Sequence, residues 1–340
     1  MAVYKRKYVR VASLFSGCGG MDLGFSKARS KKLRYSIVWA NDIDKDAAET
    51  YKNNLNSNIV CKDVWKINML EVPDADVIIG GFPCEDFSVL RGAKRDKICS
   101  TRGLLYKRLI DAIKVKQPSI FVAENVKGLL SVKNGKVMEE IKRTMEEDLP
   151  VKYELHTKLI NFADYGVPQM RERVIIVGIR KDSGICFSFP RARYRERHVP
   201  VKEAFRGVKN ILYNNEKTEI SDKIKGMLNK IPPGGNYKDT RRYKDMNWMS
   251  VIYRKLDKNK PAPTIIAGGG GGTHLYHYSE QRAITNRERA RLQGFPDKFK
   301  FSGNITSVRR QIGNAVPPGG IRPIASEILR AIEANESKRR

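Results

Sequence analysis

The chain has 340 residues, of which 65 are Lys or Arg and 37 are Asp or Glu, so its formal net charge is +28. So large an excess of positive charge indicates a polyanionic partner, with nucleic acid as the first candidate. An anionic membrane surface is the rival partner, but the sequence has neither a long apolar segment nor an isolated basic amphipathic helix. The length allows one large domain with a smaller one beside it.

The cysteine content argues against a disulfide framework and against a zinc site. The five cysteines are an odd number, and none of them forms a CxxC pair. The amino terminus is charged and lacks the apolar stretch of a signal peptide. These features predict a protein without a bound metal that works in a reducing, intracellular compartment.

The first predicted unit is a strand, a glycine-rich turn and a helix. Residues 9–15 form the strand, residues 16–22 (Ser-Gly-Cys-Gly-Gly-Met-Asp) form the turn, and the helix begins near Met21. Glycines between a strand and a helix allow a ligand to approach the backbone and the amino terminus of the helix. Asp22 stands where a GxGxxG pattern needs its third glycine, which argues against a plain NAD site.

Two acidic residues follow at the ends of the next strands. The strand over residues 35–42 ends at Asp42, roughly twenty residues after the glycines, where a nucleotide-binding α/β fold accepts hydrogen bonds from ribose hydroxyls. Alternatively, Asp42 caps the helix predicted over residues 45–54. Asp63 closes another short strand and is expected to meet an adenine amino group. Together these strand ends predict a nucleoside cofactor site on a doubly wound sheet.

A cysteine follows the fourth predicted strand. The apolar run after Asp76 ends in Gly-Gly-Phe-Pro, a sharp turn, and Cys84 comes next. Ligands bind at the carboxyl ends of the strands in such sheets, so Cys84 is a candidate nucleophile. The alternative is a buried apolar cysteine, which is the commoner role. The basic segment 87–102 is either a lid over a site or an ordinary solvated connection.

The last strands of this domain carry an acid and two arginines. The strand over residues 118–126 bears Glu124, which is a candidate proton carrier if the site closes, or else a structural hydrogen-bonding group. Strands over 153–163 and 173–179 flank Arg171. Because alternate residues of a strand share a face, we expect Arg171 and Arg173 both to face the cleft, unless they form a solvated face. Helices are predicted over residues 104–116 and 138–149.

Strand and helix signals weaken beyond about residue 184, which predicts a small, irregular second domain. Residues 191–197 are a basic run, and residues 268–272 are five consecutive glycines. These glycines are either a flexible linker or a place where backbone lies against nucleic acid. Thr285 and Glu288 form a capping box that opens a helix through Leu292, and an apolar helix is predicted over residues 321–334.

Taken together, these motifs resemble those of the DNA (cytosine-5)-methyltransferases, and the resemblance spans nearly the whole chain. The matching segments, in the order of the family, are Phe15-Ser-Gly-Cys-Gly-Gly, Asn41-Asp42, Asp63, Phe82-Pro83-Cys84, Glu124-Asn125-Val126, Gln169-x-Arg171-x-Arg173, residues 282–296 and Gly313-Asn314-Ala315-Val316-Pro317-Pro318. The chain departs from the family at two positions. Glu85 replaces the usual Gln after Pro-Cys, and Ile43 stands where members often carry an aromatic residue over the adenine.

The resemblance implies a fold and a division of roles. The expected fold is α/β, with the Rossmann-like, doubly wound, mostly parallel sheet of S-adenosylmethionine-dependent methyltransferases and a smaller irregular target-recognition domain. Residues 1–180 would form the catalytic and cofactor-binding domain, and residues 181–280 the target-recognition domain. Residues 281–340 would return to the catalytic domain and end in its last helix.

The resemblance also implies the chemistry. The Cys84 thiolate would add to C6 of a flipped-out cytosine, because the adduct makes C5 nucleophilic. Glu124 would donate a hydrogen bond or proton to N3, Arg173 would hold O2, and Arg171 would steady the loop or the base. The residues that would bind S-adenosylmethionine are Phe15, Ser16, Gly17, Gly19, Gly20, Asp42, Ile43, Asp63, Val64, Pro83, Asn314 and Val316.

The implied substrate is double-stranded DNA containing a short specific sequence. A cognate restriction endonuclease encoded nearby, a monomeric state and a place with the nucleoid in the bacterial cytoplasm are expected as well. The nearest alternative is an RNA (tRNA) cytosine-5 methyltransferase built on the same motifs. A sequence-specific repressor would need none of Cys84, Glu124 and the two arginines. An NAD oxidoreductase is disfavoured by Asp22 and by the basic charge.

Overall fold

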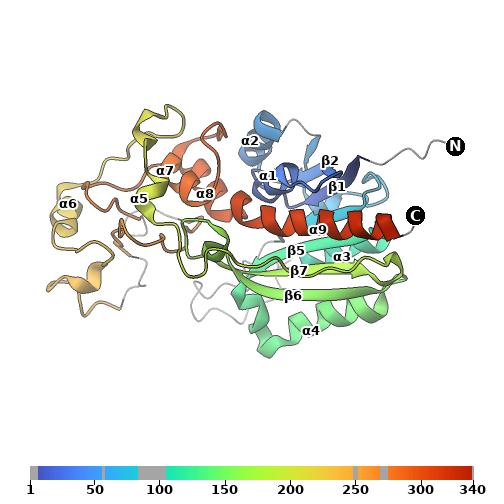
Figure 1. The fold of residues 1–340 in the computed structure, drawn as a ribbon. Coiled ribbons are helices and arrows are strands. Elements are labelled where there is room, and N and C mark those ends of the chain that lie inside the picture. The colour runs from blue at the N-terminus through green and yellow to red at the C-terminus, as the bar shows by residue number, and fades with distance from the viewer. Residues whose placement is uncertain (1–6, 56–57, 83–104, 248–251, 269–274, 339–340) are drawn as a thin grey trace. The chain divides into compact units, whose positions relative to one another are not determined.

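The structure is a computed structural model that describes residues 7–55, 58–82, 105–247, 252–268 and 275–338 (Figure 1). The chain divides into two compact units, each of which is discontinuous in sequence. Unit 1 comprises Met1–Asn161, Glu172–Arg191 and Ile321–Arg340, and unit 2 comprises Phe162–Arg171 and Ala192–Gly320. The predicted boundaries at residues 180 and 280 divide the chain by role rather than by compactness, and they stay a prediction.

Unit 1 is built on a seven-stranded sheet of order β3-β2-β1-β4-β5-β7-β6. The pairs among β1 to β5 are parallel, whereas β7 runs antiparallel to both β5 and β6. The predicted doubly wound, mostly parallel fold is therefore confirmed. The strands are β1 (Tyr8–Leu14), β2 (Arg34–Asp42), β3 (Ile59–Cys61), β4 (Val77–Gly80), β5 (Ile120–Val126), β6 (Tyr153–Asn161) and β7 (Glu172–Arg180).

Helices cover both faces of this sheet, which is why its inner strands are continuous apolar runs rather than alternating ones. All four residues of β4 are buried. Helix α9 lies on the near side of the sheet in Figure 1, where the Tyr35 hydroxyl donates to the Ala325 carbonyl at 3.0 Å. The helices of the described part of unit 1 are α1 (Gly20–Lys27), α2 (Lys45–Leu55), α3 (Leu105–Lys116), α4 (Lys136–Arg143) and, from residue 321 onward, α9 (Pro318–Lys338).

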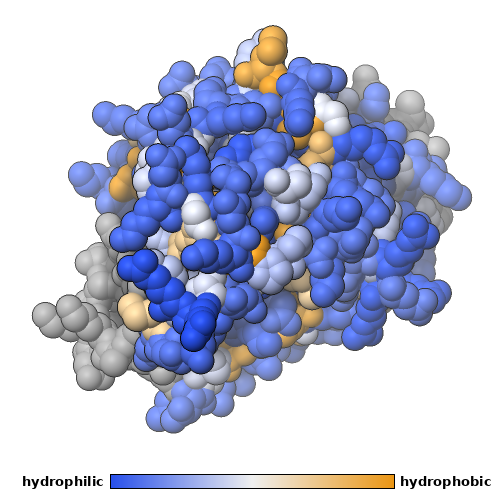
Figure 2. Space-filling model, turned by 90° about the vertical axis from the view of Figure 1, so that its left-hand side faces the viewer, coloured by the Kyte–Doolittle hydropathy of each residue, from blue (hydrophilic) through white to orange (hydrophobic). Residues whose placement is uncertain are grey.

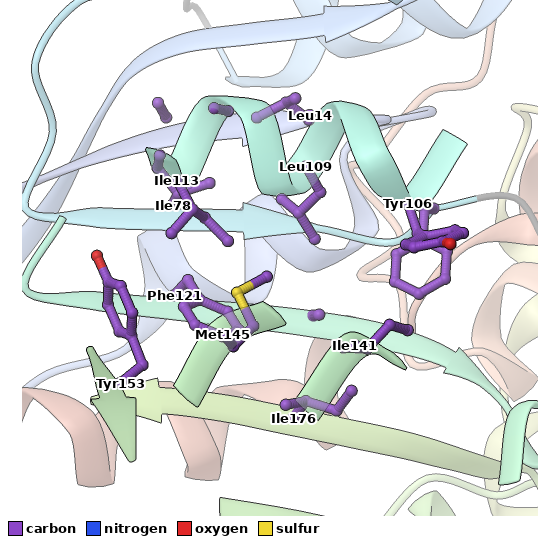
Figure 3. Packing of buried hydrophobic residues seen from close by; sticks show 14 of the residues in the cluster. Leu14, Ile78, Tyr106, Leu109, Ile113, Phe121, Ile141, Met145, Tyr153 and Ile176 are labelled. Atoms are coloured by element: carbon purple, nitrogen blue, oxygen red, sulfur yellow. The ribbon is translucent and has the colours of Figure 1, made fainter. Parts of the chain in front are cut away.

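The main apolar core lies between the sheet and helices α3 and α4. Figure 3 shows Leu109 and Ile113 of α3 and Ile141 of α4 directed at strand residues that include Ile78 and Phe121. Each such side chain contributes about 1.5–3 kcal/mol when it leaves water. The packing therefore holds the ends of β4 and β5 in fixed positions.

One predicted helix differs from the structure. The helix expected over residues 138–149 ends at Arg143 and continues as a π-helical turn over Thr144–Asp148. The turn is closed by the Leu149 amide, which donates to the Thr144 carbonyl at 3.2 Å. Met145 and Leu149 are both buried. Both side chains pack into the main apolar core beside this turn.

Unit 2 contains short helices and isolated β-bridges in its described residues, as expected for an irregular domain. The predicted capping box at Thr285 and Glu288 is confirmed, and it opens a helix that ends at Leu292. Two apolar clusters, around Leu256 and around Tyr276, supply the core of this unit. Its α-helices are α5 (Val201–Ala204), α6 (Asp222–Leu228), α7 (Asn286–Leu292) and α8 (Ile305–Asn314).

The surface in Figure 2 is dominated by hydrophilic side chains, with apolar residues in small separate spots. Among the described residues, no helix has the length and apolar character needed to cross a membrane.

Candidate active site

The glycine turn after β1 has an unusual backbone. Phe15, Gly17 and Gly19 have φ of 54°, 55° and 87°, all in the left-handed region. A side chain at Gly19 would clash with Leu55 and Tyr51, whereas a Cβ at Gly17 would meet no atom within 4 Å. Gly19 therefore allows α1 to pack on α2, and Gly17 leaves open space above the backbone. A non-glycine residue in this region, such as Phe15, is a feature often found at functional sites.

Asp42 at the end of β2 binds this turn. Its Oδ2 accepts a hydrogen bond from the Gly17 amide at 2.7 Å, and its Oδ1 accepts one from the Asp44 amide at 2.9 Å. Burial raises the pKa of Asp42 despite these hydrogen bonds. The alternative role of helix cap belongs to Asp44, whose side chain accepts from the amides of Asp46 and Ala47. Asp42 thus serves the glycine turn rather than α2.

The neighbouring strand end completes one edge of the site. Asp63 accepts from the Trp65 amide at 3.0 Å and starts a short 3-10 turn whose first residue, Val64, is buried. Ile43 is 67% exposed beside it. The predicted cofactor residues from Phe15 to Val64 lie at the carboxyl ends of β1, β2 and β3, which are adjacent parallel strands. An open backbone turn with a neighbouring acid fits a nucleoside cofactor, so the residues present suit S-adenosylmethionine.

A second group of residues lies at the ends of β4 and β5. Cys84 and Pro83 fall outside the described residues, as do Glu85 and the segment 87–102. The residue just before them, Phe82, is buried, and its carbonyl accepts from Asn125 Nδ2 at 3.0 Å. Asn125 therefore anchors the chain immediately before the predicted nucleophile. The sequence signal for this role was an amide next to Glu124 at a strand end.

Glu124 and Arg173 form an ion pair across β5 and β7. Arg173 Nε lies 3.0 Å from Glu124 Oε1, and the side chains are only 13% and 10% exposed. Arg173 Nη1 also donates to the Glu172 carbonyl at 2.7 Å. The structure thus brings together two of the predicted catalytic residues. The guanidinium fixes the direction of the carboxylate at the edge of the sheet where Asn125 holds Phe82.

Arg171 directly precedes β7, which begins at Glu172, and the expectation that it faces the cleft together with Arg173 stays a prediction. Arg171 belongs to unit 2, where its side chain is buried. Its guanidinium donates to the carbonyls of Ile265, Gly313 and Ala315 at 3.0, 2.9 and 3.1 Å. It therefore supports the segment that contains Asn314.

A glutamine in the same motif has a similar supporting role, which was not assigned from the sequence. Gln169 is buried, its Nε2 donates to the Leu292 carbonyl and to Gln293, and its Oε1 accepts from the Ile265 amide at 2.7 Å. Asn314, at the end of α8, is exposed, and Val316 is buried. Their predicted contact with the cofactor stays a prediction.

The described residues contain no group of three or more His, Cys, Asp or Glu side chains that could hold a metal ion. Of the five-glycine run, only Gly268 lies within the described residues.

Comparisons with known proteins indicate the family of the chain. A family model described as C-5 cytosine-specific DNA methylase matches residues 9–330. The chain is 44% identical to the Type II methyltransferase M.NgoFVII of Neisseria gonorrhoeae, over 97% of this chain and 88% of that protein. It is 38% identical to the Type II methyltransferase M.BbvI of Brevibacillus brevis, over 94% and 91% of the two chains.

A solved structure has the same fold. A candidate DNA modification methyltransferase encoded within a prophage of E. coli superposes with a TM-score of 0.75 at 23% identity, covering 96% of this chain and 99% of that one. At this identity the likeness concerns the fold alone.

Proposed function

Because the chain belongs to the family of C-5 cytosine-specific DNA methylases, we propose that it moves a methyl group from S-adenosylmethionine to C5 of a cytosine in a short specific sequence of duplex DNA. Its enzyme class is DNA (cytosine-5-)-methyltransferase, of the restriction-modification kind. The use of S-adenosylmethionine is a general property of this class. The cofactor contacts, the covalent step and the extrusion of the base are the proposed parts.

The observation that carries the proposal is the contact between the glycine turn and Asp42. The 2.7 Å hydrogen bond from Gly17 holds one carboxylate oxygen beside a turn with open space above it. The carboxylate would accept from the ribose hydroxyls, and Asp63 from the adenine amino group, with Ile43 against the ring. When bound, S-adenosylmethionine supplies an electrophilic methyl group on a sulfonium. The turn, Asp42, Ile43 and Asp63 would orient it.

The reaction requires a nucleophile because C5 of cytosine is too poor a nucleophile alone. The Cys84 thiolate would add to C6, and the electron pair of the C5–C6 double bond would become available at C5. As C5 bonds to the methyl carbon, the bond between that carbon and the sulfonium sulfur would break, and its electron pair would stay on the sulfur of the departing thioether. Loss of the C5 proton to a base, with return of the electron pair and departure of the thiolate, would restore the ring. Each new bond is matched by one that breaks.

Glu124 and Arg173 would stabilise the charge that develops on the ring. Glu124 would hold N3 by a hydrogen bond or proton, and Arg173 would hold O2 while it fixes the direction of Glu124 across 3.0 Å. The ion pair would hold both side chains in place on the sheet, so little reorganisation would be needed during the reaction. Preorganised groups of this kind provide a large share of enzymatic rate enhancement.

The target base must leave the stacked duplex before Cys84 can reach C6, at a cost of a few kcal/mol. The basic segment 87–102 would close over it, and the large positive charge would bind phosphates. We further propose that residues 181–280 read the target sequence, that the enzyme acts as a monomer, and that it protects DNA against a cognate endonuclease without a stable complex.

The test combines labelled S-adenosylmethionine with duplex DNA and, separately, tRNA. We expect transfer to duplex DNA only; transfer to tRNA alone would make the chain an RNA methyltransferase. Cys84→Ser should abolish transfer while binding of DNA and cofactor persists, because only the nucleophile is lost. Cys186→Ser, at an exposed cysteine, is the matched control and should remain active. Near wild-type turnover of the Cys84 variant would exclude the covalent mechanism.

A further inference from the structure

Asp22 is a buried acid that the proposed mechanism leaves unused. It lies in the first turn of α1, directly after the glycine turn, and its side chain is fully buried. The Tyr51 hydroxyl donates to Oδ1 at 2.8 Å. The other oxygen, Oδ2, is buried without a hydrogen-bond partner among the described residues. A buried carboxylate oxygen without a partner is costly, and proteins rarely keep one without reason.

The surroundings of Asp22 increase this cost. Its pKa is raised to about 6, mainly by burial and to a smaller extent by the charge of Asp42, although the hydroxyl groups of Tyr51 and Ser13 act to lower it. A carboxyl with a raised pKa favours the fold only while it is protonated, so this stability is lost as the pH rises through about 6. At pH 8 the ionised carboxylate therefore destabilises the protein without cofactor.

The field around the glycine turn is negative, although the chain as a whole is strongly basic. Burial raises the pKa of the Cys18 thiol in the turn, and the charges of Asp42, Asp22 and Asp44 also act to raise it. Among the described residues, the groups that act most strongly on the pKa of Asp22 are Tyr51, Ser13 and Asp42, and none of these three is a cation. A negative site beneath an open turn is suited to a ligand that carries positive charge.

We propose that Asp22 is the buried countercharge for the positive sulfonium of the cofactor, and that it makes the site prefer this cation over the neutral thioether product. The inference rests on the proposed function and deepens it. Methyl transfer removes the positive charge from the ligand, so the attraction of Asp22 is present before the reaction and absent after it. The same residue thereby favours binding of the substrate and release of the product.

In this proposal Asp22 does not touch the ligand. It acts through its electric field and by supporting the glycine turn, so it is a positioning residue. The turn is tied to its surroundings by the Ser16 hydroxyl, which donates to Ser13 Oγ at 2.9 Å and accepts from the Asn41 amide at 3.3 Å. The Ser13 side chain also acts to lower the pKa of Asp22, so the two residues influence one another. A buried charge is poorly screened by salt. At an effective dielectric constant near 20, a carboxylate within about 10 Å of a bound cation changes the affinity of the protein for that cation by about tenfold.

The experiment measures dissociation constants of S-adenosylmethionine and S-adenosylhomocysteine by calorimetry at pH 8 for the full chain. Asp22→Asn keeps the size of the side chain and an oxygen that accepts from Tyr51, but removes the charge. We expect it to weaken binding of S-adenosylmethionine about tenfold and that of S-adenosylhomocysteine less than twofold. Retained binding of the thioether also shows that the variant is folded. Glu49→Gln, which removes an exposed charge from α2, should change neither constant.

Proton exchange gives a second measurement that does not depend on turnover. A cation near Asp22 lowers its pKa, so binding of S-adenosylmethionine at pH 6 should release protons to the buffer. Binding of the neutral thioether should release far fewer. Calorimetry in buffers of different ionisation enthalpy measures this release. In Asp22→Asn the difference between the two ligands should largely disappear, since Asp42 and Asp44 remain unchanged.

The outcomes separate this inference from the proposed function. Equal weakening of both ligands would assign Asp22 a purely structural role and overturn the inference, as would unchanged binding of both. If the wild-type chain bound neither ligand, the proposed cofactor itself would be wrong. Selective loss of S-adenosylmethionine affinity, together with loss of proton release, supports Asp22 as the countercharge.

Discussion

The Glu124–Arg173 pair is formed by residues that are diagonal neighbours on two antiparallel strands. Glu124 lies opposite Ile175, and Arg173 lies opposite Val126, so the two side chains share one face two positions apart. Their low exposure distinguishes this pair from the neighbouring Lys127–Glu172 pair, whose side chains are 61% and 48% exposed. Removing one partner of the buried pair leaves a charge without compensation, whereas exposed pairs contribute only about 0–1 kcal/mol.

Substitution of this pair should therefore affect turnover more than cofactor binding. We expect Glu124→Gln to lower kcat by roughly 10²–10⁴, the range for a lost proton-transfer group, because Gln keeps the shape but not the proton chemistry. Arg173→Ala should also lower kcat, since the direction of the carboxylate is no longer fixed. Lys127→Ala is the matched control and should leave kcat unchanged. Steady-state kinetics with oligonucleotide DNA measures these values; an active Glu124→Gln enzyme would contradict the assigned role.

The roles of residues whose partners are close in the sequence were easier to predict than the roles of residues whose partners are far away along the chain. Asp42 and Glu124 drew attention because Asp42 ends β2 and Glu124 lies near the end of β5. The three carbonyl partners of Arg171 lie 94, 142 and 144 residues away along the chain, so its burial in unit 2 left no local signal. Asp22 was noticed only as a missing glycine. Its burial and its hydrogen bond to Tyr51, 29 residues away, depend on how α1 packs on α2.

At the scale of elements, the strands of unit 1 were predicted within a few residues because each is a short β-branched run closed by a polar or glycine residue. The capping box of α7 was readable for the same reason, since both partners lie three residues apart. The π-helical turn after α4 was not, because it depends on which of Met145 and Leu149 reach the core. The glycine turn shows the same limit: the two central glycines are distinguishable only by what surrounds them.

This difference leads to a prediction for the turn between β1 and α1. Gly19→Ala should lower the free energy of unfolding by about 2 kcal/mol or more, because an alanine there adds a left-handed backbone cost of about 1–2 kcal/mol to a clash with Leu55 and Tyr51. Gly17→Ala should lower the free energy of unfolding by less, because the added Cβ meets no neighbouring atom and only the left-handed backbone disfavours alanine. Gly226→Ala, inside α6 with open space around it, should stabilise by about 0.5–1 kcal/mol. Urea denaturation measures all three; equal stability of the Gly19 and Gly226 variants would refute this view of the turn.

At the scale of the whole molecule, charge is the dominant feature. A net charge of +28 on 340 residues is far more than solubility requires, and the visible face in Figure 2 is largely hydrophilic. Among the acidic residues, Asp22 and Asp42 lie at the glycine turn. The chain thus combines a basic total charge with negative charge around the glycine turn, where we propose that the cofactor binds.

Binding of DNA should accordingly depend strongly on salt. If the basic residues make six to ten phosphate contacts, the affinity should fall by roughly 10³–10⁵ between about 50 and 200 mM salt, because bound counterions are released. Fluorescence anisotropy with a labelled duplex gives the slope of log affinity against log salt. The Cys84→Ser variant should show the same slope, since the substitution removes no positive charge. A nearly flat dependence would exclude the phosphate backbone as the main source of affinity.

The position of α9 in the chain affects the synthesis of the protein on the ribosome. Ile321, Ile324 and Ile328 are fully buried parts of unit 1, yet they follow the whole of Ala192–Gly320 in the chain. At about 5–20 residues per second, translation of that stretch takes on the order of ten seconds. Throughout this interval the ribosome has made all seven strands of the sheet, but it has not yet made α9, which packs on that sheet. A nascent chain of this kind exposes apolar sheet surface, so chaperone binding and translation speed become determinants of how much active enzyme a cell obtains.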